Sequence, residues 1–220
     1  MIKISISNDI LDVCPHFSFK AIECNVINSK SNNNLWEEIE IYSKEITSKY
    51  KISDINKRPT ILATRQAYKA LGKDPNRYRP SAEALCRRIV KGMPLYKIDT
   101  LVDLINLVSI KSGYSIGGFD ADKIVGSLSL GVGKTGERFE AIGRGQLNIE
   151  GLPVYRDNIG GIGTPSSDEE RTKITANTSH LLIIINGYSG TEGLSETSNF
   201  AIELLKKYAE ATEIAVQTIE

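Results

Sequence analysis

The sequence has few of the residues on which metal and disulfide chemistry depend. Its 220 residues include three cysteines and two histidines, scattered along the chain. Cys14, Cys24 and Cys86 are too few and too far apart for a disulfide framework or a zinc knuckle. Neither His16 nor His180 lies in a recognisable metal-binding or catalytic motif. The sequence therefore implies no metal ion and no organic cofactor, and the scarcity of cysteine favours a reducing cytoplasm.

Long apolar runs and an excess of charge of one sign are also absent. The longest aliphatic run, Leu181 to Ile185, is far too short to span a bilayer. Residues 1–13 alternate polar and apolar side chains, which is typical of a strand and not of a signal peptide. The 27 basic and 27 acidic side chains cancel, so no global field would attract nucleic acid or a membrane. We therefore predict a cytoplasmic protein with no membrane partner.

The order of the predicted elements favours an α+β fold with a β-rich core and flanking helices. Apolar residues recur at helical spacing over residues 35–50, 61–71, 81–91, 99–111 and 195–209. Period-2 alternation predicts a strand over residues 2–6, with residues 17–28 as its hairpin partner. After Gly113 the apolar runs shorten and glycine becomes frequent, which predicts strands and turns, a polar loop at 164–172 and a last short strand at 215–219. No linker separates these parts, so we expect one domain over residues 1–220.

The segment GVGKT at residues 131–135 resembles a phosphate-binding loop only in part. Such a loop requires a glycine five positions before Gly133, where this chain has Leu128. No helix is predicted to begin at Lys134, and a turn and a strand-like segment follow instead. We predict a Lys-Gly hairpin turn.

Two local patterns indicate function more strongly. Residues 57–97 contain eleven basic and two acidic side chains, a net of +9, with tyrosines among them. Clustered cations attract phosphates and aromatic rings stack on bases, although the same cations could lie on opposite faces and pair with the acidic remainder. Glycine pairs at 117–118 and 160–161 leave backbone uncovered, either for tight turns or for the approach of a ligand. The nucleic-acid-binding candidates are Arg77, Arg79, Arg87, Arg88 and Lys91.

Four further segments, in order, give the chain a family resemblance. They are RPSAEAL at 79–85, LVDLIN at 101–106, GFDADKI at 118–124 and Gly136–Glu137. Together they resemble the B3/B4 domain of the phenylalanyl-tRNA synthetase beta subunit, and especially free-standing B3/B4 proteins, most strongly over residues 58–190. The resemblance implies an α+β fold. It also implies a pocket that, in the synthetase, hydrolyses tyrosine wrongly attached to the phenylalanine tRNA.

The polar editing residues of that family are replaced in this chain. The family segments V-D-x-T-N-Y and G-x-P-x-H-A-F-D supply a threonine and a histidine, where this chain has Ile105 and Gly117. The family glutamate falls at Asn186, whereas Asn106 and the pair Phe119–Asp120 match the pattern. Isoleucine and glycine cannot position a water molecule through a side chain. The resemblance therefore supports the fold and the pocket but not the same editing chemistry. The candidate pocket residues are Asn106, Gly117, Gly118, Phe119, Asp120, Gly160, Gly161 and Asn186.

Three functions remain open from the sequence. The first is a tRNA-associated module that binds tRNA or its aminoacyl end without catalysis. The second is a trans-editing aminoacyl-tRNA hydrolase, in which the backbone and the substrate's own hydroxyl group hold the water. The third is a small-molecule protein that binds an amino-acid-like ligand on the same fold. A continuous basic patch beside the glycine pocket would favour RNA, whereas dispersal of the cations would favour a small ligand.

Overall fold

The structure is a computed structural model that describes residues 1–219, and it has an α+β fold. The helices are α1 (Asn8–Leu11), α2 (Asn33–Lys49), α3 (Pro59–Ala70), α4 (Ser81–Val90), α5 (Thr100–Ser112) and α6 (Leu194–Ala209), with short 3₁₀ turns η1 (Ile55–Lys57), η2 (Ala121–Lys123) and η3 (Glu170–Thr172). The strands are β1 (Ile4–Ile6), β2 (Ser18–Asn25), β3 (Ile116–Asp120), β4 (Leu128–Val132), β5 (Glu140–Ala141), β6 (Gly145–Gln146), β7 (Pro153–Arg156), β8 (Gly161–Thr164), β9 (Ser167–Asp168), β10 (His180–Gly187) and β11 (Thr212–Ile219).

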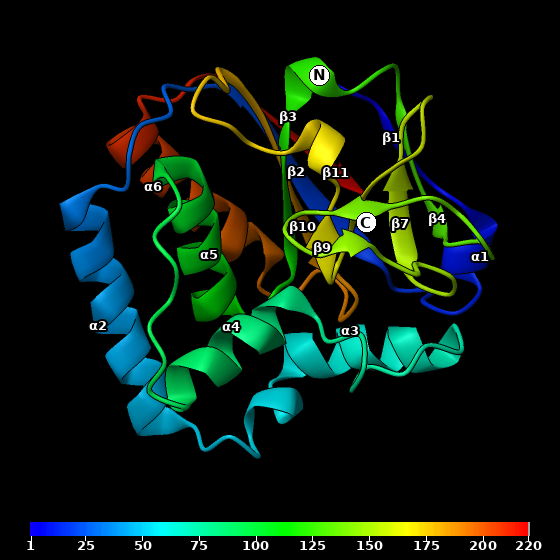
Figure 1. Cartoon of the computed structure of the whole chain (residues 1–220), viewed down its shortest axis with the longest axis horizontal. Helices are drawn as coiled ribbons and strands as arrows, with labels where there is room; N and C mark the ends of the chain where they lie inside the picture. Colours follow the sequence, from blue (N-terminus) through cyan, green and yellow to red (C-terminus); the bar gives the residue numbers. More distant parts are fainter. Residues whose placement is uncertain (220) are drawn as a thin grey trace.

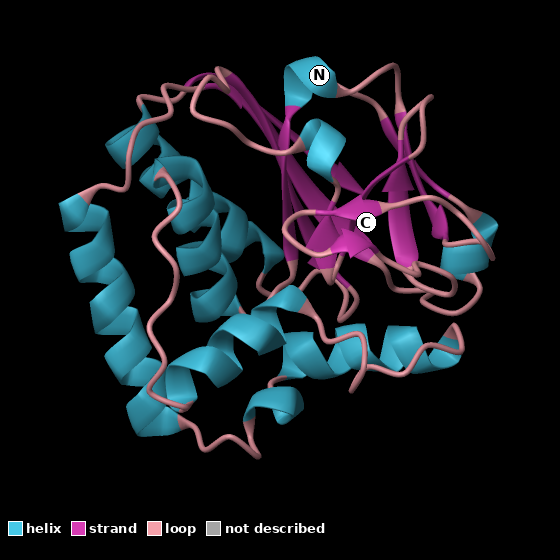
Figure 2. Cartoon of the chain, viewed as in Figure 1, coloured by secondary structure: helices cyan, strands magenta, loops and turns pink. Residues whose placement is uncertain are grey.

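The long helices α2, α4, α5 and α6 lie on one side of the molecule and the sheets on the other (Figure 1 and Figure 2). A four-stranded antiparallel sheet has the order β11-β2-β10-β3, and a five-stranded sheet has the order β1-β4-β7-β8-β9. Figure 1 shows α2, α5 and α6 beside the first sheet and α3 beneath, with β1, β4 and β7 on the far side. The helices and the two sheets thus form three layers.

Strand β10 separates two hydrophobic cores by its alternation. Leu181, Ile183 and Ile185 face the helices, and they pack with residues of α2, α4, α5 and α6. Leu182 and Ile184 face the other way and pack against the five-stranded sheet. Because both faces of β10 are buried, its sequence is continuously aliphatic rather than alternating in polarity.

The predicted helices are confirmed, and their ends follow the capping signals. In α5, the Asp99 side chain accepts a hydrogen bond from the backbone N–H of Val102 at 2.9 Å. Gly113 ends the helix with φ of 81°, the left-handed conformation that glycine adopts without strain. The final strand is also present and begins earlier than predicted, at Thr212.

Two predictions from the strand patterns are wrong. Residues 17–28 do not form a hairpin with the first strand, because β1 pairs in parallel with β4 while β2 pairs with β10 and β11. The intervening helix α1, anchored by the fully buried Ile10, carries the chain from one sheet to the other. The predicted loop at 164–172 instead contains β9 and η3, since Gly163 pairs with Asp168.

Candidate functional site

A cavity of about 420 Å³ lies where α4, α5, β3 and β9 meet. Its walls are mostly aliphatic, and its polar members come from α4, α5, β9 and the segment after η3. The lining residues are Ser81, Leu85, Ile98, Val102, Ile105, Asn106, Ser109, Ile116, Gly118, Ile142, Asp168, Lys173 and Ile174. On α5 these residues fall at positions i, i+3, i+4 and i+7, so a single helical face forms one wall. The volume suits a ligand the size of an amino acid.

Glycines on β3 and β8 leave room for side chains in and beside this cavity. A Cβ atom at Gly118 would lie 2.6 Å from Ile105 Cδ1, and one at Gly117 would lie 2.7 Å from the Phe119 ring. A Cβ at Gly163 would lie 2.8 Å from Asp168 Oδ1. Of the sequence-predicted glycines, Gly118 therefore lines the cavity and Gly117 lies beside it, with steric reasons for both.

Asp168 places a carboxyl group in this largely aliphatic cavity. Its Oδ2 atom accepts a hydrogen bond from the backbone N–H of Gly118 at 3.3 Å, and Oδ1 has no hydrogen-bond partner among residues 1–219. Burial raises the pKa of this carboxyl group to about 7, and the hydrogen bond from Gly118 offsets only part of the rise. Asp168 can therefore exchange a proton near neutral pH.

We expect Asp168→Asn to stabilise the protein at alkaline pH. The group ionises near its ordinary pKa of 3.8 in the unfolded chain and near 7 in the fold, so the folded state holds an extra proton between these values. Stability therefore falls as pH rises from about 4 to 7, by at most about 4 kcal/mol. The amide carries no charge and escapes this loss. Urea unfolding at pH 4.5 and pH 8 measures the difference, and equal relative stability at both values would contradict the assignment.

A second cavity, of about 390 Å³, adjoins the first and is lined by cations. The two cavities share Leu85, Ile98 and Asn106, so Asn106 lies at their boundary. The cationic cavity is lined by Arg79, Ala84, Leu85, Arg87, Arg88, Lys91, Met93, Leu95, Tyr96, Ile98, Asn106 and Arg144. Four of the five sequence-predicted nucleic-acid residues thus lie together here, and Arg77 does not line this cavity. An aliphatic cavity and a cationic cavity thus meet at the three residues that they share, of which Asn106 is the one with a polar side chain.

Buried Glu83 on α4 organises part of the cationic cavity. Its side chain is 2% exposed and makes a 2.7 Å ion pair with Arg65. Arg79 and Arg87 each approach the same carboxylate at 3.6 Å. The guanidinium of Arg88 stacks over the Tyr96 ring, 4.2 Å from its centroid. These contacts fix the cations that line the cavity.

Other basic residues of segment 57–97 have structural roles. Arg58 is buried and donates hydrogen bonds to the carbonyls of Ile110 and Lys111 at 2.9 and 2.8 Å. Lys73 is buried and donates a hydrogen bond to the Asn148 carbonyl at 3.0 Å. The basic residues of this segment therefore divide into two groups: some stabilise the fold, and others gather beside the aliphatic cavity.

The remaining predicted pocket residues lie in the protein framework. Phe119 is fully buried between the sheets, and Asp120 accepts a hydrogen bond from Thr178 at 2.9 Å. Asn186 accepts a hydrogen bond from the Tyr155 hydroxyl at 2.8 Å and donates one to the Ser115 carbonyl at 3.0 Å. Gly160 lies in the turn between β7 and β8, and Gly161 is the first residue of β8 and pairs with Arg156. None of these residues lines either cavity.

Two residues that line the cavities, Asp168 and Arg144, are not among those predicted from the sequence. Asp168 lies in a polar segment beside Glu169 and Glu170, and only the pairing of β8 with β9 selects which carboxylate faces the cavity. Arg144 lies in the turn between β5 and β6, which the Gly-Arg-Gly pattern predicts, but its place beside α4 depends on distant packing. No local signal distinguishes either residue.

Within GVGKT, Gly131 and Val132 are the last residues of β4, and a turn follows at Thr135 and Gly136, as predicted. Strands β4 and β5 do not pair with each other, so the turn is not a hairpin, and this part of the prediction is wrong. The backbone N–H of Lys134 donates a hydrogen bond to Glu137 at 2.8 Å. Among the described residues no helix follows Lys134 directly, so the segment lacks the helix N-terminus that a phosphate loop requires.

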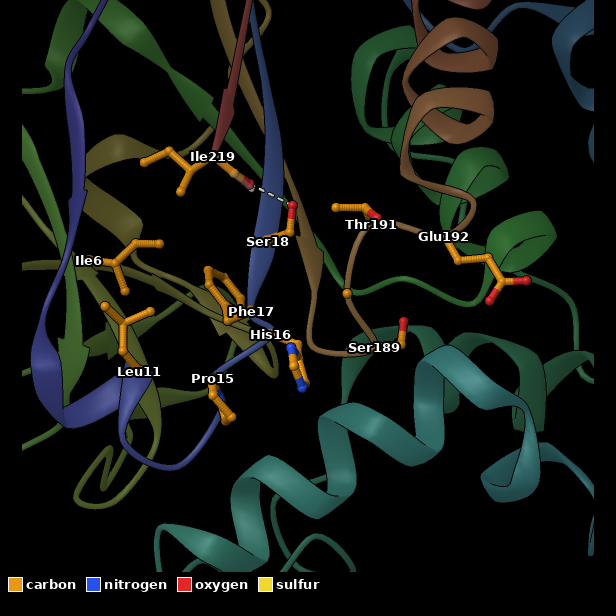
Figure 3. Close-up of a pocket in the computed structure, with 11 residues that line it drawn as sticks. Ile6, Leu11, Pro15, His16, Phe17, Ser18, Ser189, Thr191, Glu192 and Ile219 are labelled. Atoms are coloured by element: carbon orange, nitrogen blue, oxygen red, sulfur yellow. Dashed lines mark hydrogen bonds between the residues drawn. The ribbon is translucent and has the colours of Figure 1, made fainter.

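A larger hollow of about 680 Å³ lies elsewhere and contains none of the predicted site residues (Figure 3). Figure 3 shows Ile6, Leu11 and Phe17 on one side of it and Thr191 and Glu192 on the other. The Ser18 hydroxyl donates a hydrogen bond to the Ile219 carbonyl at 2.5 Å on its wall. Of the described residues, no lysine or arginine lines this hollow, and fewer aliphatic side chains line it than line the aliphatic cavity.

Residues 1–219 contain neither a metal-binding cluster nor a helix able to span a membrane. No group of three or more His, Cys, Asp or Glu side chains is placed to hold a metal ion. No helix in this part of the chain combines the length and apolarity that crossing a membrane requires.

The class that the structure defines is an α+β protein in which an aliphatic cavity adjoins a cavity lined by cations. The particular family follows from comparison with known proteins. A family model described as the B3/4 domain matches residues 63–210, and the chain belongs to this family. The resemblance inferred from the four sequence segments is thereby confirmed.

Solved structures support the same fold. The crystal structure of an N-terminal fragment of the phenylalanyl-tRNA synthetase beta subunit from Pyrococcus horikoshii is similar, with a TM-score of 0.51 and 15% identity. The match covers 97% of this chain and 50% of the fragment, so the chain corresponds to about half of that fragment's length. No curated protein matches the chain.

Proposed function

We propose that this B3/4 protein is a tRNA-associated module that holds the aminoacylated end of a tRNA across its two cavities. The observation that carries the proposal is the junction at Asn106 between the cationic and the aliphatic cavity. Guanidinium and ammonium groups bind backbone phosphates, and the exposed Tyr96 ring offers a surface on which an unpaired base stacks. The aliphatic cavity then receives the esterified amino acid.

The single-stranded 3′ end of a tRNA matches this arrangement in chemistry. It presents phosphates, unpaired bases and an amino acid in succession, and the two cavities present cations, an aromatic ring and aliphatic walls in the same succession. The relatedness of the fold to a synthetase beta subunit is consistent with such a partner.

Reversing the charge of Lys91 and Arg144 should weaken tRNA binding by tenfold or more. Both residues are exposed and line the cationic cavity, so their loss removes phosphate contacts without opening the core. If each contacts one phosphate, the slope of log affinity against log salt should fall by about 1.5. Fluorescence anisotropy of labelled tRNA at several salt concentrations measures both quantities.

The matched control is Lys69→Glu with Lys206→Glu. These lysines are exposed on α3 and α6 and line neither cavity. Each double variant changes the net charge by −4 from the neutral starting value, so general repulsion of RNA is equal in both. Equal weakening by the two variants would remove the assignment of the cationic cavity to RNA.

A second candidate is a small-molecule protein that binds an amino-acid-like ligand. The observation that favours it is the Asp168 carboxyl group in the aliphatic cavity, since a carboxylate can pair with the ammonium group of such a ligand. This function gives no role to the adjoining cations. Calorimetry with free branched-chain amino acids distinguishes the two: binding of the free ligand without binding of tRNA would favour the small-molecule function.

A further inference from the structure

The Asp168 carboxyl group has no structural partner that explains its place in an aliphatic cavity. Among residues 1–219 it is the only acidic side chain that lines this cavity, and its one hydrogen bond comes from the backbone of Gly118. Gly117 and Gly163 leave room for it, because a Cβ atom there would lie 3.6 Å and 2.8 Å from Asp168 Oδ1. A carboxyl group that is desolvated in an accessible cavity without a structural partner is typical of a functional site.

The charged groups of the surrounding elements are occupied with other partners. Lys173, which also lines the cavity, pairs with Glu170, and Arg171 of η3 pairs with Asp157 at 2.9 Å. On β3, Asp120 pairs with Lys123 at 3.2 Å. Strand β8 contributes no charged residue.

The charged groups of the two neighbouring helices are also engaged elsewhere. On α5, Asp103 accepts hydrogen bonds from Ser31 and Trp36, and Lys111 lies over the Phe200 ring. On α4, Glu83 pairs with three arginines. No ion pair holds Asp168 in the charged state.

The position of Asp168 relative to the cationic cavity favours an ester as the reacting group. If phosphates lie among the cations and an acyl side chain lies among the isoleucines, the linkage between them lies near the shared boundary at Asn106. Asp168 and Asn106 line the same aliphatic cavity as that acyl group. The carboxyl group is thus placed to hold a water molecule beside an ester carbonyl.

We propose that Asp168 is a catalytic residue, the general base that activates water to hydrolyse an aminoacyl ester with an aliphatic side chain. This proposal rests on the proposed function, because it requires the aminoacylated end to occupy both cavities. It assigns to the site both a reaction and a substrate class.

The step balances without a further reactant. The Asp168 carboxylate removes a proton from water as the water oxygen forms a bond to the ester carbonyl carbon. The bond between that carbon and the ribose oxygen then breaks, and the proton passes from Asp168 to the leaving oxygen, which becomes a hydroxyl group. Free amino acid and deacylated tRNA result. A carboxyl group that exchanges protons near neutral pH is suited to both transfers.

The substrate class follows from the walls of the cavity. Ile98, Val102, Ile105, Ile116 and Ile174 present branched aliphatic surfaces. Among the polar side chains of the lining, the Ser109 hydroxyl is already committed to the Tyr114 carbonyl at 2.7 Å. Esters of valine, isoleucine or leucine would bury their apolar side chains against these walls.

The test compares deacylation and binding by the wild-type protein, Asp168→Asn and Asp122→Asn. Each protein is mixed with tRNAs charged with valine, isoleucine, leucine, tyrosine or phenylalanine, and release of amino acid is timed from pH 5.5 to 8.5. We expect selective release of an aliphatic amino acid, with a rate above background that is half-maximal near pH 7 and levels off above pH 8. Asp168→Asn should lower that rate at least a hundredfold and leave tRNA affinity within threefold. Asp122, an exposed residue outside both cavities, is the control and should leave the rate unchanged.

The outcomes separate this proposal from the proposed function. Binding of tRNA without release of any amino acid would overturn the catalytic proposal and leave the binding module. Release that Asp168→Asn does not slow would overturn the assignment of Asp168. Preferential release of tyrosine would overturn the substrate class. Neither binding nor release would overturn both proposals. A stable, folded Asp168→Asn variant that binds tRNA excludes misfolding as the cause of lost activity.

Discussion

Replacing Glu83 with alanine should destabilise the protein by about 3 to 5 kcal/mol. The carboxylate is 2% exposed and lies 2.7 Å from the Arg65 guanidinium, which is itself 8% exposed. Removing the carboxylate leaves that buried guanidinium without its counter-charge, although it keeps hydrogen bonds to Pro75 and Asn76. Urea unfolding monitored by circular dichroism measures the change. A loss below 1 kcal/mol would contradict the role assigned to this buried ion pair.

A matched control for Glu83→Ala is available on another helix. Glu37 lies exposed on α2, and its replacement by alanine should change stability by less than about 0.5 kcal/mol. Glu83 also approaches Arg79 and Arg87, both of which line the cationic cavity. The isosteric Glu83→Gln variant should therefore weaken tRNA binding, because two cations lose the carboxylate that orients them.

Gly133→Ala should destabilise the protein by about 3 kcal/mol. A Cβ atom at this position would lie 1.9 Å from the carbonyl oxygen of Ile149 and 2.7 Å from its carbonyl carbon. These are backbone atoms, which cannot move aside as the end of a flexible side chain can. The backbone of Gly133 also donates a hydrogen bond to Leu152 and accepts one from Gly151, at 2.8 and 2.9 Å. Thermal unfolding measures the loss.

Gly160→Ala serves as the control for Gly133→Ala. A Cβ atom at Gly160 would meet no atom within 4 Å, and stability should change by less than about 1 kcal/mol. If both alanine variants were equally stable, the close approach at Gly133 would not be what requires glycine in GVGKT. The expected contrast explains this glycine by packing rather than by phosphate binding.

The helices and their ends could be predicted because their signals are local. In α5, the aliphatic spacing, the cap at Asp99 and the glycine at 113 lie within one segment and agree with one another. The partner of each strand could not be predicted in this way. Alternation over Ile4–Ile6 predicts a strand, but its pairing with Leu128–Leu130 joins segments more than 120 residues apart.

The candidate site shows the same difference between local signals, which the sequence carries, and long-range contacts, which it does not. Arg87 and Arg88 lie on α4 and Arg79 and Lys91 flank it, so four of the predicted cations lie together. Asn106 and Gly118 lie on elements that the sequence defined, and both line the aliphatic cavity. The side-chain amide of Asn186 instead forms hydrogen bonds with Tyr155 and Ser115. Asp168 reaches the cavity only through the β8–β9 pairing, which no periodicity in the sequence reveals.

The joined cavities at Asn106 are the centre of this account, and one comparison tests them most directly. The affinity of the protein for an intact tRNA is measured beside its affinity for the same tRNA lacking the single-stranded 3′ end. We predict at least tenfold weaker binding of the shortened tRNA, and little further loss when Lys91 and Arg144 are changed to glutamate, because their phosphate partners are already gone. Equal affinity for the two tRNAs would contradict the claim that the cationic and aliphatic cavities together hold the aminoacylated end.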